Sequence, residues 1–346
     1  MDFVHVTDQA SVFIVDMRGQ YAIFSELAER GIEKFINQWK NIAVVVQRTW
    51  YASWLVCLEC WTIPQCDNCD IAVAWHTHPT NPESMLGLCH ICKREYKRTW
   101  TCDKCSSSEL QTYGVWAQQV EEKLWQLWVQ NCVTLHWSSV WSLPKSAKLQ
   151  EQLTTTQCVI WTASHIQWLT SRTPDLIIWQ QADSALHSPD FQSAWQTYIA
   201  LSSMNRTFSD ATHIYQCFNP QHYAVINAAA WKEQKMRDDE LAYRKPLLYP
   251  PFGQLCVLQY KHEIEASMFT KVNTLYQDLL YAQKQYEFDA IKIYTTPPSV
   301  YKMYGKYRYS IIMKWKNLRE FLDIVYSKLR IQEQGFSVDW EPEHLV

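Results

Sequence analysis

Apolar residues alternate between short runs and helical stripes along the first two thirds of the chain. The runs VFIVDM (12–17) and IAVVVQ (42–47) predict buried strands with a helical stretch between them. Further strands are predicted for CVTLH (132–136), QCVIWT (157–162), LIIWQ (176–180) and HIYQCF (213–218), with helical segments interleaved. Because strands alternate with helices, we expect an α/β domain with a mostly parallel sheet that extends to about residue 220.

A helix is predicted between the second and third of these strands. Its apolar face is formed by residues at helical spacing: Val120, Leu124, Leu127 and Trp128. The cysteine-rich stretch before this helix interrupts the α/β pattern, so we expect it to be an insertion within the domain.

The pattern changes after YPPFG (249–253), which marks a clear break. The remainder predicts strand 255–261, helix 267–285, strand 289–295, strand 308–315, helix 317–330 and strand 336–340. This β-α-β-β-α-β order indicates a small ferredoxin-like α+β domain. The second of its helices has a regular apolar face, made of Leu318, Phe321, Leu322, Val325 and Leu329.

Eight of the twelve cysteines fall in four Cys-x-x-Cys pairs: Cys57/Cys60, Cys66/Cys69, Cys89/Cys92 and Cys102/Cys105. A two-residue gap lets two thiolates converge on one tetrahedral ion, and two pairs make a closed structural zinc site. The four pairs therefore predict two Cys₄ sites, each with a Zn²⁺ ion. Their role is structural, because four thiolates leave no open position for water and a module this small lacks its own core.

Core packing and redox chemistry account less well for these cysteines. Unconnected core cysteines would be scattered, as Cys132, Cys158, Cys217 and Cys256 are. A redox Cys-x-x-Cys motif would explain one pair rather than four. His76, His78 and His90 lie nearby, and we expect them to be bystanders because all-thiolate sites are available.

Net charge and composition limit the kinds of partner and the cellular location that we expect. The net charge is −3, so a nucleic-acid role would depend on local basic patches. No apolar run approaches the roughly 18 residues that a membrane span needs, and no leader pattern follows Met1. We therefore expect a cytoplasmic protein with reduced thiols and no membrane partner. Two counts are abnormal: glycine occurs 7 times and tryptophan 18 times.

Two basic segments are candidates for nucleic-acid contact. The cysteine-rich module carries one of them: Lys93, Arg94, Lys97, Arg98 and Lys104. The second, YKMYGKYRYSIIMKWK (301–316), interleaves cations with tyrosines, as Lys302, Lys306, Tyr307 and Arg308 show. Cations that follow a backbone beside aromatics that stack on bases are typical of single-strand binding. A solvated face and an edge strand would produce the same two patterns without any nucleic acid.

Several segments in order resemble one family. They are the cysteine array, VEEKL, DSALHSPDF (183–191), CFNPQHYAVI (217–226), ELAYRKPLLYPPF (240–252), GKYRYSIIMK (305–314) and VDWEPEHL (338–345). Together they resemble the C-terminal half of the primosomal protein N′ (PriA) replication-restart helicases, over nearly the whole chain. The resemblance implies a RecA-like second helicase lobe with an inserted two-zinc module, followed by the ferredoxin-like domain. Residues 1–50 would begin the lobe, 51–110 would bind zinc, 111–222 would complete the lobe, 223–253 would connect, and 254–346 would form the last domain.

The family also implies how the zinc sites are paired and what they serve. Its two sites are nested, so Cys57, Cys60, Cys102 and Cys105 would hold one ion, and Cys66, Cys69, Cys89 and Cys92 the other. The spacing alone leaves consecutive pairing open. Partners implied by the resemblance are forked or single-stranded DNA, single-strand-binding protein and other primosome proteins, in a nucleoid-associated cytoplasmic setting.

Departures from the family affect its ATP chemistry. The chain contains no G-x-x-x-x-G-K-[ST] loop. We therefore expect that the chain by itself neither binds ATP and Mg²⁺ productively nor hydrolyses ATP. The stretches that correspond to the nucleotide-facing segments are WTAS (161–164) and SSMNRTFS (202–209), in which Arg206 is a residual candidate for a phosphate contact. A separate first helicase lobe would complete the enzyme. The alternative function is a zinc-stabilised protein-interaction module of the replisome without DNA binding.

The abnormal tryptophan count has a proposed origin. Trp50, Trp61, Trp116, Trp161 and Trp168 fall where the family usually has glycine. One hypothesis is that UGA codons, read as glycine in the source, are translated here as tryptophan. A second hypothesis is that the helicase segments have degenerated. It is favoured by SSMNRTFS, in which residues other than tryptophan replace the family's glycines, and by Trp195, which stands where the family tends to have an acidic residue.

Overall fold

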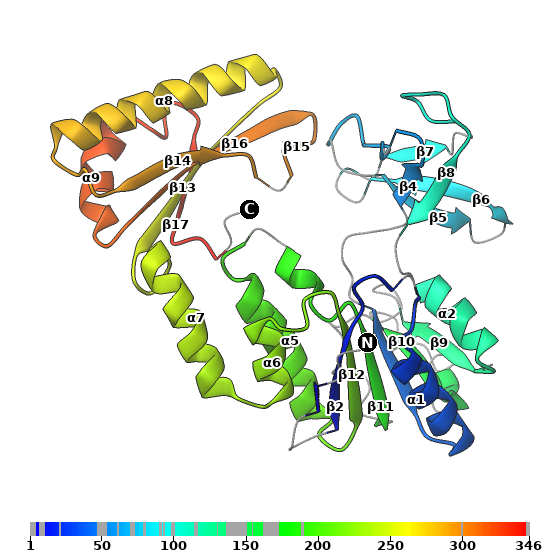
Figure 1. Ribbon diagram of the computed structural model, residues 1–346. Helices are drawn as coiled ribbons and strands as arrows, with labels where there is room; N and C mark the ends of the chain where they lie inside the picture. The colour runs from blue at the N-terminus through cyan, green and yellow to red at the C-terminus, as the bar shows by residue number, and fades with distance from the viewer. Residues whose placement is uncertain are drawn as a thin grey trace. The chain divides into compact units, whose positions relative to one another are not determined.

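The structure is a computed structural model (Figure 1). It describes residues 5–6, 11–20, 22–46, 54–60, 62–69, 73–78, 81–89, 92, 94–97, 101–113, 117–129, 131–135, 151–153, 155–161, 173–187, 190–298 and 300–343. The chain divides into two compact units. The first comprises residues 1–50, 115–188 and 193–239, and the second comprises 51–114, 189–192 and 240–346.

A seven-stranded sheet forms the centre of the first unit, in the order β1-β2-β12-β11-β3-β10-β9. Its strands are β1 (His5–Val6), β2 (Val12–Asp16), β3 (Ile42–Val46), β9 (Cys132–Leu135), β10 (Cys158–Trp161), β11 (Leu176–Gln180) and β12 (Thr212–Cys217). Neighbouring strands pair in parallel, except β1, which is antiparallel to β2. The predicted mostly parallel sheet is thus confirmed. Its central strand β11 is buried at every position because helices cover both faces of such a sheet.

Helices pack on both faces of this sheet through two separate apolar clusters. On one face α1 (Glu26–Asn37) and α2 (Ala117–Gln126) contribute Ile32 and Leu124. On the other, α5 (Ser193–Thr207) and α6 (Tyr223–Ala229) contribute Leu201 and Val225. α1 begins at Ser25, whose Oγ accepts a hydrogen bond from the Ala28 amide at 3.2 Å. The short η3 (Ser184–His187) precedes α5.

The predicted apolar face of α2 is wrong at its last residue. Val120 and Leu124 are fully buried, as expected. Trp128 lies beyond the end of the helix with φ at 64°, and 81% of its surface is exposed. The reason is that the helix stops at Gln126, so the next turn, which would have brought Trp128 onto the apolar face, does not form.

A five-stranded antiparallel sheet forms the C-terminal part of the second unit, with four strands in the order β14-β16-β13-β17 and a short fifth strand beside β16. Its elements are β13 (Gln254–His262), α8 (Glu265–Gln285), β14 (Lys292–Thr296), β16 (Lys306–Trp315), α9 (Leu318–Lys328) and β17 (Ser337–Trp340). The short β15 (Lys302–Met303) pairs with β16. Both helices pack on one face of the sheet, where Leu275, Phe321 and Ile311 share a core (Figure 1). Helix α7 (Glu233–Leu247) precedes this sheet.

The cysteine-rich segment contains two small sheets. β4 (Trp54–Cys57) pairs with β8 (Leu110–Tyr113). β5 (Ala74–His78), β6 (Asn81–Leu88) and β7 (Glu95–Lys97) form a separate three-stranded antiparallel sheet. Its small core consists of Val73 and Trp75 with buried cysteines.

Several predictions fall on positions that the structure does not describe. They concern Lys93, Arg98, Trp50, Trp61, Trp116, Trp168 and His90, as well as the side chains of His76 and His78. Across the described parts of the chain, no helix is both long enough and apolar enough to cross a membrane.

Candidate metal centres and basic surfaces

The paired cysteines meet in two groups of four. In the first group, Cys57, Cys60, Cys102 and Cys105 place their Sγ atoms within 4.8 Å of one another. The Sγ atoms of Cys57 and Cys105 are 3.4 Å apart, and those of Cys60 and Cys102 are 3.6 Å apart. The first cysteine of each pair is buried, and Cys105 is exposed, so this group lies at the surface.

The second group consists of Cys66, Cys69, Cys89 and Cys92, also within 4.8 Å of one another. The Sγ atoms of Cys66 and Cys92 are 3.7 Å apart. Three of these cysteines are fully buried, which makes the second group the more enclosed one. Burial raises the pKa of the Cys69 thiol to about 12.

A repeated backbone turn positions the cysteines. The amide of Cys57 donates to the carbonyl oxygen of Thr62 at 3.0 Å, and the amides of Cys89 and Cys102 donate in the same way to Arg94 and Ser107. In each case the acceptor is five residues further along the chain. This turn brings the two cysteines of a pair to one side, so that both thiols can reach the same point.

The two groups could each hold a metal ion. Four sulfur donors within one site and at this spacing suit a soft, tetrahedral ion. Hydrogen bonding to the Thr62 side chain lowers the pKa of Cys60 to about 6, which favours the thiolate form that a metal needs. The structure has the nested grouping that the resemblance implied, and not the consecutive pairing that the spacing also allowed.

A polar cluster surrounds the second group. The Tyr96 hydroxyl lies 3.1 Å from Cys66 Sγ and also contacts the Asp67 carboxylate. Arg94 Nη1 donates to Asp67 Oδ2 at 2.6 Å. The hydrogen bonds from Tyr96 and Arg94 hold the pKa of Asp67 below its ordinary value. Arg94, one of the predicted DNA contacts, is therefore paired with a carboxylate.

The turn between β15 and β16 also contacts this second group. The Gly305 amide donates to the Asn68 carbonyl oxygen at 2.8 Å, and Lys302 Nζ donates to the Asp67 carbonyl oxygen at 2.8 Å. The backbone of Tyr304 hydrogen-bonds to Cys69. Nothing in the sequence indicated this contact, because its two sides lie more than two hundred positions apart.

The predicted basic and aromatic residues of the last domain differ in accessibility. Lys306 is exposed, and its Nζ lies 4.0 Å from Glu263. Lys302 lies over the Tyr307 ring, with 4.8 Å between Nζ and the centroid. Arg308 donates from Nε to Gln259 Oε1 at 3.3 Å, and burial lowers its pKa. In the other basic segment, Lys97 and Lys104 are exposed.

Arg206, the residual candidate for a phosphate contact, lies on α5. Its Nη1 is 3.3 Å from Glu233 Oε2, and its Nη2 donates to Ser202 Oγ at 3.2 Å. An arginine that is paired with a carboxylate offers less net charge to a phosphate than a free one.

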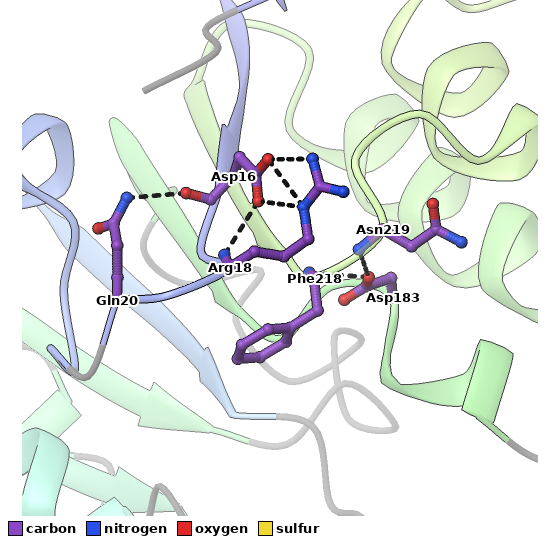
Figure 2. A network of polar contacts seen from close by, with 6 residues as sticks. All are labelled: Asp16, Arg18, Gln20, Asp183, Phe218 and Asn219. Carbon is purple, nitrogen blue, oxygen red and sulfur yellow. Dashed lines mark hydrogen bonds and ion pairs between the residues drawn. The ribbon is translucent and has the colours of Figure 1, made fainter. Parts of the chain in front are cut away.

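A second polar network lies where β2, β12 and β11 end (Figure 2). Arg18 folds back onto Asp16, and its Nε and Nη2 both donate to that carboxylate, which lowers the pKa of Asp16. The fully buried Asp183 accepts hydrogen bonds from the amides of Phe218 and Asn219. Asp183, Phe218 and Asn219 belong to two of the segments that carry the family resemblance, but the sequence did not indicate that these segments meet.

No family model matches the chain. It is 23% identical to the replication restart protein PriA of Bacillus subtilis over 366 aligned residues, which cover 96% of this chain and 42% of that protein. The chain is similar to PriA over nearly its whole length. The PriA proteins of Borreliella burgdorferi and Synechocystis are both 24% identical to it, and the alignments cover 96% and 93% of this chain and 51% and 39% of those proteins.

The predicted resemblance to PriA is thereby confirmed, and it extends along nearly the whole chain. The chain spans about half the length of the curated relatives that it matches or less. This is the coverage expected of a C-terminal half.

Proposed function

We propose that this chain is the zinc-bearing, DNA-binding part of a PriA-like replication-restart protein. The observation that carries the proposal is the combination of similarity to PriA over 96% of the chain with two nested groups of four cysteines. Structural zinc is the metal that suits these groups, because Zn²⁺ favours closed tetrahedral sites with four thiolate ligands.

The proposed domain organisation follows the resemblance. Residues 1–50 and 111–222 form a RecA-like second helicase lobe, interrupted by the zinc module at 51–110. Residues 223–253 connect it to a ferredoxin-like domain at 254–346. Support comes from the parallel sheet in the first part and from the antiparallel order β14-β16-β13-β17 in the last part.

DNA binding is assigned to the two basic segments. Lys97 and Lys306 are exposed cations that could contact phosphates, and Tyr307 offers an aromatic ring beside them. The same proposal includes Lys93 and Arg98, together with Arg94, Lys302 and Arg308. Binding that depends on such cations weakens steeply as salt concentration rises, because phosphate contacts release counterions.

ATP hydrolysis is not expected of this chain by itself. A phosphate cradle and Mg²⁺ ligands are needed for phosphoryl transfer, and Arg206 is paired with Glu233. A separate first lobe would supply the other half of the nucleotide site. An ATPase assay with fork DNA, with and without such a lobe, tests this part of the proposal.

The decisive experiment is fluorescence anisotropy of the zinc-loaded protein with a labelled DNA fork. We expect binding that falls with salt concentration, and a several-fold weaker affinity for Lys306→Gln. The matched control is Lys284→Gln, which removes the same charge from the exposed end of α8. No binding at low salt would overturn DNA recognition and leave the alternative, a zinc-stabilised protein-interaction module of the replisome.

A further inference from the structure

The turn between β15 and β16 meets one particular Cys-x-x-Cys pair through its backbone. Asp67 and Asn68 are the two residues between Cys66 and Cys69, and their carbonyl oxygens accept the hydrogen bonds from Lys302 and Gly305. Tyr304 adds a backbone hydrogen bond to Cys69 itself. Three contacts therefore converge on four consecutive residues of the second cysteine group.

The conformation of this tetrapeptide depends on the convergence of its cysteines. The amide of Cys69 lies 3.2 Å from the Cys66 carbonyl oxygen, so the chain turns tightly through Asp67 and Asn68. This turn directs the two acceptor carbonyls outward. The side chain of Asp67 is held by Tyr96 and Arg94, but these bonds do not join the two ends of the turn. An ion bound by both Cys66 and Cys69 would join them and so fix the positions of both acceptor carbonyls.

Gly305 fits the turn closely. Its φ is +77°, and an added Cβ would lie 3.1 Å from Asn68 Oδ1. Backbone geometry and space thus both favour glycine at this position. Because β15 and β16 are joined by this turn, whatever holds Gly305 also holds the start of β16, which carries Lys306, Tyr307 and Arg308.

We propose that the second cysteine group, when it holds its ion, positions the basic and aromatic start of β16 through the hydrogen bonds of Gly305 and Lys302. The first group makes no such contact among the described residues. This inference rests on metal binding as proposed above, but it does not depend on DNA recognition. The two groups therefore have different roles: the first stabilises the cysteine-rich module alone, and the second also orders the start of β16.

Amide hydrogen exchange of the full chain, read by mass spectrometry, tests this positioning role. The variant Cys66→Ser should speed exchange at least tenfold in peptides that cover residues 302–308, whereas Cys57→Ser should leave them unchanged. Gly305→Ala should have the same local effect while metal analysis still finds both ions. The matched control is Gly335→Ala, another glycine with positive φ in the same sheet domain.

Unchanged exchange in Cys66→Ser and Gly305→Ala, or an equal effect in Cys57→Ser, would overturn the inference. Failure of the proposed function has a different signature. A protein purified without metal would contradict the metal assignment, and an ordered 302–308 segment in a chain that does not bind forks would contradict DNA recognition alone.

A second inference concerns three tryptophans with unusual backbone conformations. Among the described residues, ten non-glycine residues have positive φ, and three of these are tryptophan: Trp39 at 56°, Trp128 at 64° and Trp231 at 59°. Tryptophan supplies 18 of 346 residues, about one in twenty. A bulky residue with positive φ is a genuine outlier, so this enrichment needs a cause.

Each of the three tryptophans lies two residues beyond the last residue of a helix, in the same hydrogen-bonded arrangement. After α1, the Trp39 amide donates to the Ile36 carbonyl oxygen at 3.0 Å, and the Lys40 amide donates to that of Phe35 at 3.0 Å. The same two bonds follow α2, at Trp128 and Val129, and α6, at Trp231 and Lys232. This is the Schellman motif, in which the residue with positive φ is usually glycine because glycine has no Cβ.

At two of these positions, burial of the indole ring does not offset the free-energy cost of the positive φ. Trp39 and Trp128 are 84% and 81% exposed, so neither ring contributes to a core. The Nε1 of Trp231 has no hydrogen-bond partner within the described structure. The corresponding positions after α8 and α9 hold Glu287 and Arg330, which shows that residues besides glycine are accommodated, but both are charged residues that favour water.

We infer that glycine is the native residue at positions 39, 128 and 231, and that their codons are UGA, read as glycine in the source and as tryptophan in the printed sequence. This adds three positions, found from backbone geometry, to the five suggested by family resemblance. It also accounts for part of the low glycine count without degeneration of the fold.

The coding DNA decides the question at each position separately. A UGA codon supports the inference there, a UGG codon overturns it there, and UGG at all three overturns it entirely. As an independent measure, Trp39→Gly should raise the folding equilibrium constant about fivefold, because the cost of a positive φ is removed. Trp179→Gly is the control: Trp179 is fully buried in β11, so its removal should lower that constant by more than a hundredfold. A lower folding constant for Trp39→Gly would count against the inference at that position.

Discussion

The Nε2 atom of the buried His213 lies 3.0 Å from the carbonyl oxygen of Phe208. Because a carbonyl can only accept a hydrogen bond, the neutral ring carries its proton on Nε2 and donates it to Phe208. Its Nδ1 has no partner among the described residues. Burial lowers the pKa of His213 to about 4, since charging the ring would place an uncompensated cation in the protein interior.

His213 should make the protein sensitive to mild acid. The ordinary pKa of about 6.5 applies to the unfolded chain, which therefore binds the proton more tightly than the folded chain does. The contribution of His213 is fully present above pH 6.5 and is lost as the pH falls towards 4, by about 3 kcal/mol in all. Urea unfolding at several pH values measures this loss. His213→Gln keeps a donor for Phe208 without a titrating ring, so its stability should vary less over this range; an identical pH dependence would contradict the assignment.

Metal content should follow the two cysteine groups. Native mass spectrometry of the purified chain should find two zinc ions, and either Cys57→Ser or Cys66→Ser should leave one, because the groups share no ligand. Cys132→Ser is the control and should keep both ions, since Cys132 lies on β9 outside the groups. Loss of both ions from a single substitution would show that the two groups form one cooperative site instead.

Asp183 should contribute strongly to stability through its backbone acceptor bonds. Its carboxylate is fully buried and accepts from the amides of Phe218 and Asn219, with 2.9 Å between Oδ2 and the Phe218 nitrogen (Figure 2). Asp183→Asn removes the charge that strengthens both bonds, and we expect a loss of about 1–3 kcal/mol in the free energy of unfolding. Asp210→Asn, at an exposed position, should change it by less than about 0.5 kcal/mol. Chemical denaturation compares the two.

Arg244 should not tolerate replacement by lysine. Its Nε donates to the buried Glu240 at 2.6 Å, its Nη1 donates to the Pro250 carbonyl oxygen at 3.2 Å, and its guanidinium lies 5.2 Å from the centre of the Phe191 ring. A lysine ammonium cannot make these three contacts together. We expect Arg244→Lys to cost about 1–3 kcal/mol.

The exposed pair of Arg30 with Glu26 provides the comparison for Arg244. The two side chains are largely solvent-accessible, and their charged atoms are 3.3 Å apart. Arg30→Lys should therefore change the free energy of unfolding by less than about 0.5 kcal/mol in the same denaturation experiment. Equal effects of the two substitutions would mean that Arg244 acts as an ordinary surface charge.

Much of the fold could be predicted because its information is local. LIIWQ is buried at every position, and its predicted bounds are those of β11. The strand predicted at 289–295 begins later, at Lys292. The cause is a single side chain. The side-chain amide nitrogen of Gln283, Nε2, donates to the carbonyl oxygens of Phe288, Asp289 and Ile291, which holds these residues in a turn. A bond of this kind between a helix and a following loop leaves no periodic pattern in the sequence.

The candidate sites likewise combine features that the sequence predicts with contacts that it does not reveal. The membership of the cysteine groups could be predicted once a family resemblance chose between nested and consecutive pairing. The contact of Gly305 with Asn68 could not, because it joins two backbones and involves no characteristic side chain. The pairing of Arg206 with Glu233, on two different helices, was hidden for a related reason: sequence spacing does not reveal which helices meet.

The pairing of β4 with β8 gives the cysteine-rich module a particular kind of independence. Trp54 lies opposite Tyr113 at one end of this ladder, and Cys57 lies opposite Leu110 at the other. The chain thus enters and leaves the module on adjacent strands, about 5 Å apart. In this respect the module begins and ends as a β-hairpin does. A gene could therefore gain, lose or exchange such a segment without redesigning the sheet that carries it.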